Sequence, residues 1–122
     1  MTKARVLIVD DERACAEVLS RVLASRGHSS VSAEDVEGAV RALREGAVDL
    51  VLLDHVLPGE TGMQAIGRLK RLTKAPVHLM SGYTDDDTRR DALLLGAAGF
   101  VPKPVEAAVL LALVDSLPEA AP

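Results

Sequence analysis

Aromatic residues and cysteine are scarce in this sequence, and each shortage excludes a class of function. One Tyr, one Phe and no Trp among 122 residues leave few rings to stack on nucleic-acid bases or on a flavin. The single cysteine, Cys15, excludes an internal disulfide and a Cys-based zinc cage.

Positive charge and long apolar stretches are also lacking. The 14 Lys and Arg residues are outnumbered by 18 Asp and Glu residues, and the formal net charge of −4 is unlike that of a nucleic-acid-binding domain with a basic face. No apolar run reaches the roughly 18 residues of a membrane span. The N-terminus, MTKARVLIVDDE, lacks the apolar stretch and cleavage site of a signal peptide. We expect a soluble, cytoplasmic protein that binds neither membrane nor nucleic acid directly.

The chain does have enough apolar residues, 48%, to fold as one well-packed domain. We assign this domain to residues 1–117. Residues 118–122 (PEAAP) are interpreted as a C-terminal tail or the start of a linker.

Short apolar runs alternate with amphipathic stretches five times. The runs predict strands at residues 4–9, 30–33, 49–53, 76–80 and 99–102, of which the second is more polar, as at a sheet edge. Apolar residues at helical spacing predict helices at 12–26, 36–46, 63–72, 84–95 and 105–117. Such alternation indicates parallel βαβ units. We predict an α/β fold with a single five-stranded parallel sheet of order 2-1-3-4-5, flavodoxin-like and doubly wound, with five helices on both faces.

Ligands of such a sheet bind beyond the carboxyl ends of the strands, near the switch between strands 1 and 3. The residues that follow the strands are Asp10, Asp11 and Glu12 after the first, Asp54 after the third, Ser81 and Gly82 after the fourth, and Lys103 and Pro104 after the fifth. Carboxylates within ~4–6 Å of each other repel, and a hard cation such as Mg²⁺ removes that conflict. A carboxylate can itself attack phosphorus and become an aspartyl phosphate, whose oxygens a lysine and a hydroxyl would hold.

Each of these residues has a simpler explanation when it is taken alone. Asp11 or Glu12 could cap the next helix. Ser81 could be a turn residue, and Lys103 a solvated surface side chain. Asp54 precedes a loop rather than a helix, so capping does not explain it. The combination at four strand ends therefore carries the prediction of phosphoryl chemistry, and no single member does.

The segments VLIVDDE, DLVLLDHVLPGETG, LMSGYTD and GAAGFVPKP resemble, in order and spacing, the receiver domain of bacterial two-component response regulators. The resemblance covers about residues 5–117. The roles that it implies are phosphorylation of Asp54, binding of Mg²⁺ by Asp10, Asp11, Asp54 and the Val56 carbonyl, binding of phosphate by Ser81, Gly82 and Lys103, and switching by Ser81 and Phe100. It also implies a cis Lys103–Pro104 peptide bond.

The sequence departs from the family pattern at the side chains that flank the phosphoryl group. These positions carry Val56 and Tyr83, and in the family they tune the hydrolysis of the phosphoryl group. Phe100 lacks a hydroxyl, so a switch at this residue has to work by packing.

The function that the resemblance implies is signalling rather than enzymatic, with catalysis only of the domain's own phosphorylation and dephosphorylation. A histidine kinase or phosphotransfer protein would donate the phosphoryl group, and an effector protein or domain would respond. The first half of helix 84–95 has no apolar residue, whereas helix 105–117 has a surplus of Leu and Val. We expect these helices and strand 99–102 to form a face that changes on phosphorylation and binds a partner or a second copy.

Three other functions are compatible with parts of the sequence. A phosphatase of the haloacid dehalogenase kind also uses an Asp nucleophile and Mg²⁺, but requires an acid two residues later, where this chain has Val56. A flavodoxin-like FMN protein requires a Ser/Thr/Gly phosphate loop after the first strand. A receiver that only docks partners, without phosphate, is disfavoured by the intact acids and Lys103.

Three of the remaining residues have structural interpretations. Cys15 lies on the apolar stripe of helix 12–26 and is interpreted as a small core residue. His78, within a strand, is interpreted as a packed neutral ring, and His55 as part of a surface loop.

Overall fold

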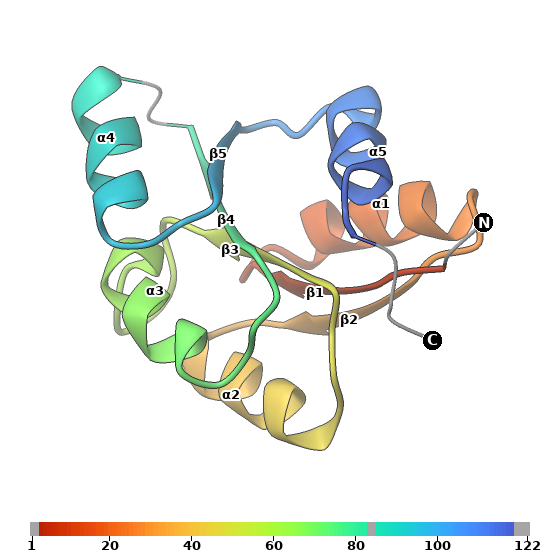
Figure 1. The fold of residues 1–122 in the computed structure, drawn as a ribbon, viewed down its shortest axis with the longest axis horizontal. Helices are drawn as coiled ribbons and strands as arrows, with labels where there is room; N and C mark the ends of the chain where they lie inside the picture. The colour runs from red at the N-terminus through yellow and green to blue at the C-terminus, as the bar shows by residue number, and fades with distance from the viewer. Residues whose placement is uncertain (1–2, 83–84, 119–122) are drawn as a thin grey trace.

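Strands and helices alternate along the chain, as the sequence predicts (Figure 1). The computed structural model describes residues 3–82 and 85–118. The elements are β1 (Arg5–Val9), α1 (Arg13–Ala24), β2 (Ser29–Ala33), α2 (Val36–Glu45), β3 (Leu50–Asp54), α3 (Gly62–Lys70), β4 (Val77–Ser81), α4 (Asp86–Leu94), β5 (Gly99–Pro102) and α5 (Ala107–Asp115).

The five strands form one parallel sheet in the order β2-β1-β3-β4-β5. Helices α1 and α5 cover one face of this sheet, and α2, α3 and α4 cover the other (Figure 1). The predicted fold class, a doubly wound sheet of order 2-1-3-4-5, is therefore confirmed. The crossover from β2 back across β1 to β3 places the topological switch between β1 and β3, where open α/β sheets bind their ligands.

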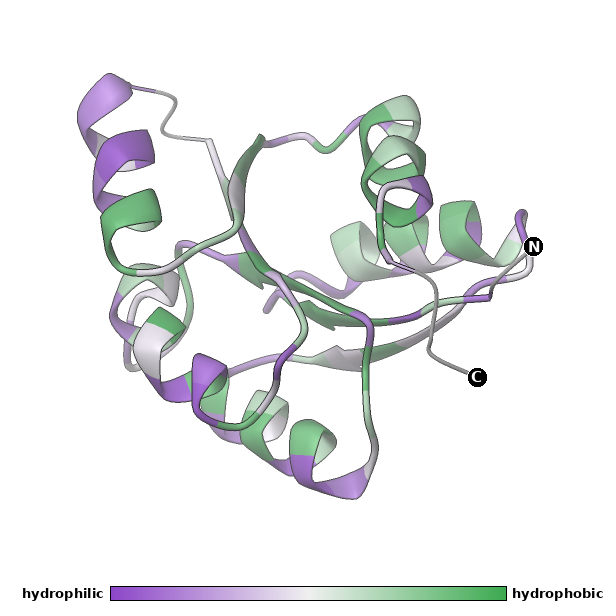
Figure 2. Ribbon diagram, viewed as in Figure 1, coloured by the Kyte–Doolittle hydropathy of each residue, from purple (hydrophilic) through white to green (hydrophobic). Residues whose placement is uncertain are grey.

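The strands divide their side chains between two apolar cores, because successive residues of a strand point to opposite faces. In β3, Val51 and Leu53 pack with α2, α3 and α4, whereas Leu50 and Leu52 pack with α1 and α5. Every residue of β3 is buried. Figure 2 shows the result, with predominantly hydrophobic strands in the middle and helices that carry both hydrophobic and hydrophilic residues. The sheet thus has little freedom to move, and it fixes the strand ends that carry the polar side chains.

The buried face of α1 differs from the prediction. Val18 is 58% exposed and Cys15 is only half-buried, whereas Ala16, Leu19 and Leu23 form the buried face. Residues 16, 19 and 23 lie on one side of a helix, and Cys15 lies beside that side rather than on it. Cys15 is therefore not a core residue. Alanine gives a weak hydrophobic signal, so the sequence alone does not predict that Ala16 rather than Cys15 is buried.

Leu19→Ala is expected to cost about 2–5 kcal/mol of unfolding free energy, because it removes a buried side chain and leaves a cavity. Val18→Ala, one residue away on the same helix, should change the unfolding free energy by no more than about 0.5 kcal/mol, because its side chain is mostly exposed. Urea denaturation of both variants measures the difference. Equal losses in the two variants would contradict this orientation of α1.

Several elements begin or end at residues other than those predicted. Strands β3 and β4 include Asp54 and Ser81, because the ladder pairs Asp54 with Met80 and Ser81 with Pro102. Helix α4 begins at Asp86, after an Asp85 carboxylate that accepts a hydrogen bond from the Thr88 N–H at 2.8 Å. The predicted start of this helix at residue 84 lies outside the described residues. Helix α5 begins at Ala107, two residues later than predicted, because the preceding Glu106 has an extended backbone.

The structure also tests the predictions for His78 and for the apolar residues of α5. His78 is half-buried in β4, and burial lowers the pKa of its imidazole, as expected for a packed neutral ring. Leu110 and Val114 are the buried residues of α5, Leu111 and Leu113 are half-buried, and Val109 is 38% exposed. The more exposed leucines are at the end of α4, where Leu94 is 77% exposed.

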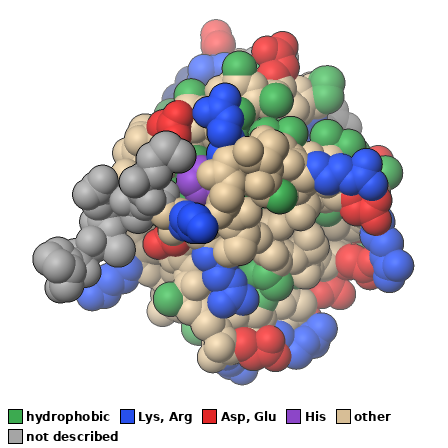
Figure 3. Space-filling model, turned by 90° about the vertical axis from the view of Figure 1, so that its right-hand side faces the viewer, with side chains coloured by type: hydrophobic (Ala, Val, Ile, Leu, Met, Phe, Trp, Pro, Cys, Tyr) green, Lys and Arg blue, Asp and Glu red, His purple; other side chains and the backbone are tan. Residues whose placement is uncertain are grey.

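Charged side chains of both signs are interspersed on the side of the molecule drawn in Figure 3, and the hydrophobic side chains there are scattered. This side, among its described atoms, offers no broad apolar area. The exposed leucines of α4 are thus the more prominent apolar feature of the described surface.

Candidate functional site

Three carboxylates meet at the carboxyl ends of β1 and β3. Asp10 and Asp11 follow β1, and Asp54 is the last residue of β3. The two strands are neighbours in register, with Val9 opposite Leu53, so the residues that follow lie at the same edge. One carboxylate oxygen from each of the three aspartates lies within 4.8 Å of the others. Asp10 and Asp54 are buried, whereas Asp11 is exposed.

Lys103, in the loop after β5, reaches across β4 to this cluster. Its Nζ donates to Asp10 Oδ2 and to Asp54 Oδ2, each at 3.1 Å. The Lys103 backbone N–H donates to the Ser81 carbonyl at 2.9 Å, which fixes the loop to the end of β4. The Lys103–Pro104 peptide bond is cis, as the resemblance implied.

Backbone groups orient the two buried carboxylates. The Glu12 N–H donates to Asp10 Oδ1 at 2.9 Å, and the Val56 N–H donates to Asp54 Oδ1 at 3.4 Å. Each carboxylate therefore has one oxygen on the backbone and the other on Lys103. The aspartates are held in place before any ligand arrives, which is what a charge-binding site requires.

The site carries more negative charge than Lys103 can balance. Burial, and then the charge of Asp10, raise the pKa of Asp54, and the hydrogen bond from Lys103 offsets only part of this rise. Burial acts to lower the pKa of Lys103, but hydrogen bonds to Asp10 and Asp54 outweigh it and the pKa is raised, so Lys103 is a firmly charged ammonium. Three carboxylates and one ammonium leave a surplus that a hard divalent cation with oxygen ligands can neutralise. The donor set fits Mg²⁺.

Three other predicted site residues, Ser81, Gly82 and Val56, lie at the strand ends next to this cluster. Ser81 is buried at the end of β4, between the strands that carry Asp54 and Lys103, and Gly82 follows it on the surface. Val56 is 57% exposed, just beyond Asp54. Tyr83 lies outside the described residues.

Phe100 lies away from the acidic cluster, on the opposite side of the sheet end. It is half-buried on β5 opposite Leu79, and it packs on the core that faces α2, α3 and α4. The guanidinium of Arg89, on α4, lies 5.4 Å from the centroid of its ring. Phe100 thus contacts α4 rather than the carboxylates.

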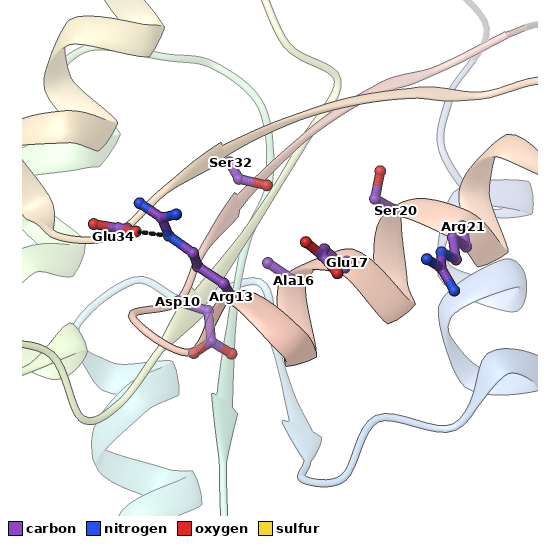
Figure 4. Close-up of a pocket in the computed structure, with 8 residues that line it drawn as sticks. All are labelled: Asp10, Arg13, Ala16, Glu17, Ser20, Arg21, Ser32 and Glu34. Carbon is purple, nitrogen blue, oxygen red and sulfur yellow. Dashed lines mark hydrogen bonds and ion pairs between the residues drawn. The ribbon is translucent and has the colours of Figure 1, made fainter.

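The sequence reasoning did not find the polar surroundings of Asp10. A pocket of about 500 Å³ opens beside Asp10, between α1 and β2 (Figure 4). Arg13 Nε donates to Glu34 Oε1 at 2.6 Å across this pocket, and both side chains are exposed. The partners are 21 residues apart, and no local pattern in the sequence indicates such a pair. Exposed ion pairs of this kind contribute little to stability.

A second, more apolar groove of about 260 Å³ adjoins the other side of the cluster. Its walls come from α1 and from the loop after β5, and its lining residues are Asp10, Ala14, Cys15, Val18, Leu19, Met80, Lys103, Pro104 and Val105. Cys15, interpreted from the sequence as a small core residue, therefore lines a surface groove together with Val18. Burial, followed by the charges of Glu12 and Asp10, raises the pKa of the Cys15 thiol, so this thiol is not activated as a nucleophile.

Comparison with known proteins agrees with this geometry. The family model of the response regulator receiver domain matches residues 6–115. The chain belongs to this family. It is 40% identical over 112 residues to response regulator protein FleR of Pseudomonas aeruginosa, an alignment that covers 91% of this chain and 24% of FleR. The chain spans about a quarter to about half the length of the relatives that match it first.

Solved response regulator structures share the fold. A response regulator from Burkholderia pseudomallei, solved with a phosphorylated aspartic acid, a calcium ion and citrate, has a TM-score of 0.84 and 25% identity and covers 90% of this receiver domain and 65% of its own chain. A CheX–CheY–BeF₃–Mg complex from Borrelia burgdorferi has a TM-score of 0.85 and 29% identity, with coverage of 93% and 87%. The receiver domain is a signalling domain, and an aspartate is phosphorylated in one of its structural relatives.

None of the helices within residues 3–82 and 85–118 has the length and hydrophobicity that a crossing of the bilayer requires.

Proposed function

We propose that this receiver domain accepts a phosphoryl group on Asp54 from a histidine kinase or a phosphotransfer protein, with the help of Mg²⁺. The observation that carries the proposal is the position of Asp54. Its buried carboxylate lies at the end of the central strand, within reach of two further aspartates and 3.1 Å from the Lys103 ammonium. Incubation with acetyl phosphate and Mg²⁺, followed by measurement of the intact mass, tests it.

The reaction moves one phosphoryl group between two nucleophiles. An oxygen of Asp54 forms a bond to phosphorus while the bond from phosphorus to the donor's histidine nitrogen breaks, and the nitrogen retains that electron pair. Lys103 has two carboxylate partners before the reaction, and its ammonium is placed to turn to the new phosphoryl oxygens. The Ser81 hydroxyl and the Gly82 N–H complete this group of donors.

Magnesium would be held by Asp10, Asp11, Asp54 and the Val56 carbonyl. It would supply positive charge for the equatorial oxygens of the transferring group. Asp10 and Asp54 are pre-oriented by the backbone N–H groups of Glu12 and Val56, which reduces the reorganisation that binding requires.

Hydrolysis of the aspartyl phosphate is the second step of the same proposal. Water attacks phosphorus, and the Asp54 carboxylate leaves, so the domain catalyses only its own gain and loss of phosphate. Val56 exposes an apolar side chain next to Asp54, and with Tyr83 it would set how readily water approaches. A haloacid dehalogenase-type phosphatase is disfavoured, because this exposed valine replaces the second acid that such an enzyme uses.

The apolar groove beside Lys103 is suited to the phosphodonor protein. Any donor histidine has to approach Asp54 at the strand ends, and this groove opens at the same place, with Asp10 and Lys103 in its wall. Val18 offers an exposed apolar side chain from α1 and Val105 a half-exposed one from the other wall. We assign the groove to an apolar side chain of the donor that docks while its histidine reacts.

The output of the proposed switch is the face formed by α4, β5 and α5. Leu93 is 47% exposed and lies four residues after Arg89, so it shares the side of α4 that contacts Phe100. Val109 adds an exposed apolar side chain from α5. An effector protein or domain, or a second copy in a homodimer, would bind there by apolar docking.

The extent of the domain is part of the proposal as well. We assign residues 1–117 to the receiver and residues 118–122 to a tail or linker. Because the chain spans only part of its relatives' length, the effector and the response that it triggers belong to the proposal.

The output face is expected to change its amide exchange when a beryllofluoride mimic of the phosphoryl group binds with Mg²⁺. The change should include residues 85–117, because Ser81 and the loop after it join the site to α4, and Phe100 joins β5 to α4. Hydrogen exchange with and without the mimic measures it. Changes restricted to α1 and α2, with residues 85–117 unaltered, would contradict this output face.

A further inference from the structure

Arg89 makes a contact that no residue of the proposed phosphorylation site makes. Its guanidinium carbon lies 5.4 Å from the centroid of the Phe100 ring, which is within the range of a cation–π interaction. The contact joins the solvent-exposed middle of α4 to β5. Phe100 is the residue to which the family resemblance gives a switching role, so Arg89 contacts the proposed switch directly.

Helix α4 has few other attachments to the sheet. Ala92 is its one buried residue, and just after the helix the Ala98 N–H donates to the Val77 carbonyl of β4 at 2.8 Å. The neighbouring Arg90 pairs with Asp87 within the same helix and so contributes nothing to the attachment. The contact of Arg89 with Phe100 therefore adds to a limited attachment of α4 to β5. A helix attached in this way can shift at modest cost.

Phe100 also lies on the path between the phosphorylation site and α4. It is three residues before Lys103 on the same strand and loop, and Lys103 is bonded to both Asp54 and the Ser81 carbonyl. Any movement of Lys103 and of the loop after Ser81 toward a phosphoryl group therefore acts on the two ends of the segment that carries Arg89 and Phe100. If Phe100 repacks inward, its ring face leaves the guanidinium.

We propose that Arg89 is a positioning residue that holds Phe100 and α4 in their unphosphorylated arrangement, so that the stack opposes phosphorylation until the site supplies enough interaction to break it. The inference rests on the proposed function. It assigns Arg89, and not the adjacent Arg90, as the residue that sets the balance between the two arrangements. A contact present in only one arrangement stabilises that arrangement by the free energy of the contact. The affinity of a ligand that binds the other arrangement falls by the corresponding factor.

The test measures beryllofluoride affinity at saturating Mg²⁺ for the wild-type chain, Arg89→Ala and Arg90→Ala. Loss of a partly exposed cation–π contact corresponds to a two- to five-fold change, so Arg89→Ala should bind beryllofluoride about two- to five-fold more tightly than wild type. Arg90→Ala should bind as wild type does. Affinity for Mg²⁺ alone should be the same in all three, since Arg89 does not touch the carboxylates. Arg89→Lys, which keeps the positive charge, should lie between wild type and Arg89→Ala.

A double-mutant cycle with Phe100→Leu separates this role from a general effect of charge. The leucine retains an apolar side chain at a half-buried position but has no ring face, so Arg89→Ala should have no further effect in that background. Equal or weaker binding by Arg89→Ala than by wild type, or an undiminished effect in the Phe100→Leu background, would overturn the inference while the proposed function stands. Failure of the wild-type chain to bind beryllofluoride would overturn both.

Discussion

Asp54→Asn is expected to abolish the ~80 Da mass gain that acetyl phosphate and Mg²⁺ produce in the wild-type chain. An amide is not a nucleophile toward phosphorus under these conditions, and Asp54 is the carboxylate at the end of the central strand that Lys103 faces at 3.1 Å. The substitution also removes a buried carboxyl group whose pKa is raised by burial and by the charge of Asp10, so we expect the variant to fold. Intact-mass spectrometry measures the result directly.

Asp115→Asn is the matched control for this experiment. Asp115 is an exposed residue at the end of α5, away from the strand ends that form the site. Its variant loses the same formal charge and should keep the full mass gain. Undiminished labelling of Asp54→Asn, or loss of labelling in Asp115→Asn, would contradict the assignment of the phosphoacceptor.

Asp11→Ala is expected to weaken Mg²⁺ binding at least about tenfold, because affinity for a hard cation depends strongly on the number of charged oxygen ligands. Asp11 is the exposed member of the three-carboxylate group, so its removal leaves the buried core unaltered. Glu12→Gln removes the same charge one residue later, outside that group, and should change the affinity far less. Calorimetric titration of the three proteins with Mg²⁺ decides the question, and an identical affinity in wild type and Asp11→Ala counts against this metal site.

The sequence was sufficient to predict the fold and the meeting of three aspartates and Lys103 at one edge of the sheet. The strands β1 and β3 each contain an uninterrupted apolar run, and β4 is apolar apart from His78 and its last residue, Ser81, which is typical of strands covered on both faces. Once these strands are parallel, the residues that follow them share one edge of the sheet. Lys103 and Asp54 are 49 residues apart in sequence, and topology alone brings them together.

Other features depend on side-chain packing and could not be predicted in this way. The burial of Ala16 rather than Cys15 on α1 could not be predicted, because alanine is a weak hydrophobic signal. The stack of Arg89 on Phe100 and the pair of Arg13 with Glu34 join residues that no local pattern relates. The surplus of apolar residues was predicted on α5, but the more exposed leucines lie at the end of α4, because α5 buries Leu110 and Val114 against the sheet.

We propose Asp54 as the one carboxylate of this receiver domain that forms the bond to phosphorus. Treatment of the acetyl phosphate-labelled wild-type chain with borohydride reduces an acyl phosphate to an alcohol, and peptide mass spectrometry then locates the reduced residue. We expect homoserine at residue 54, dependent on Mg²⁺, with Asp10 and Asp11 unmodified. Reduction at Asp10 or Asp11, or at carboxylates scattered over the surface, would contradict it.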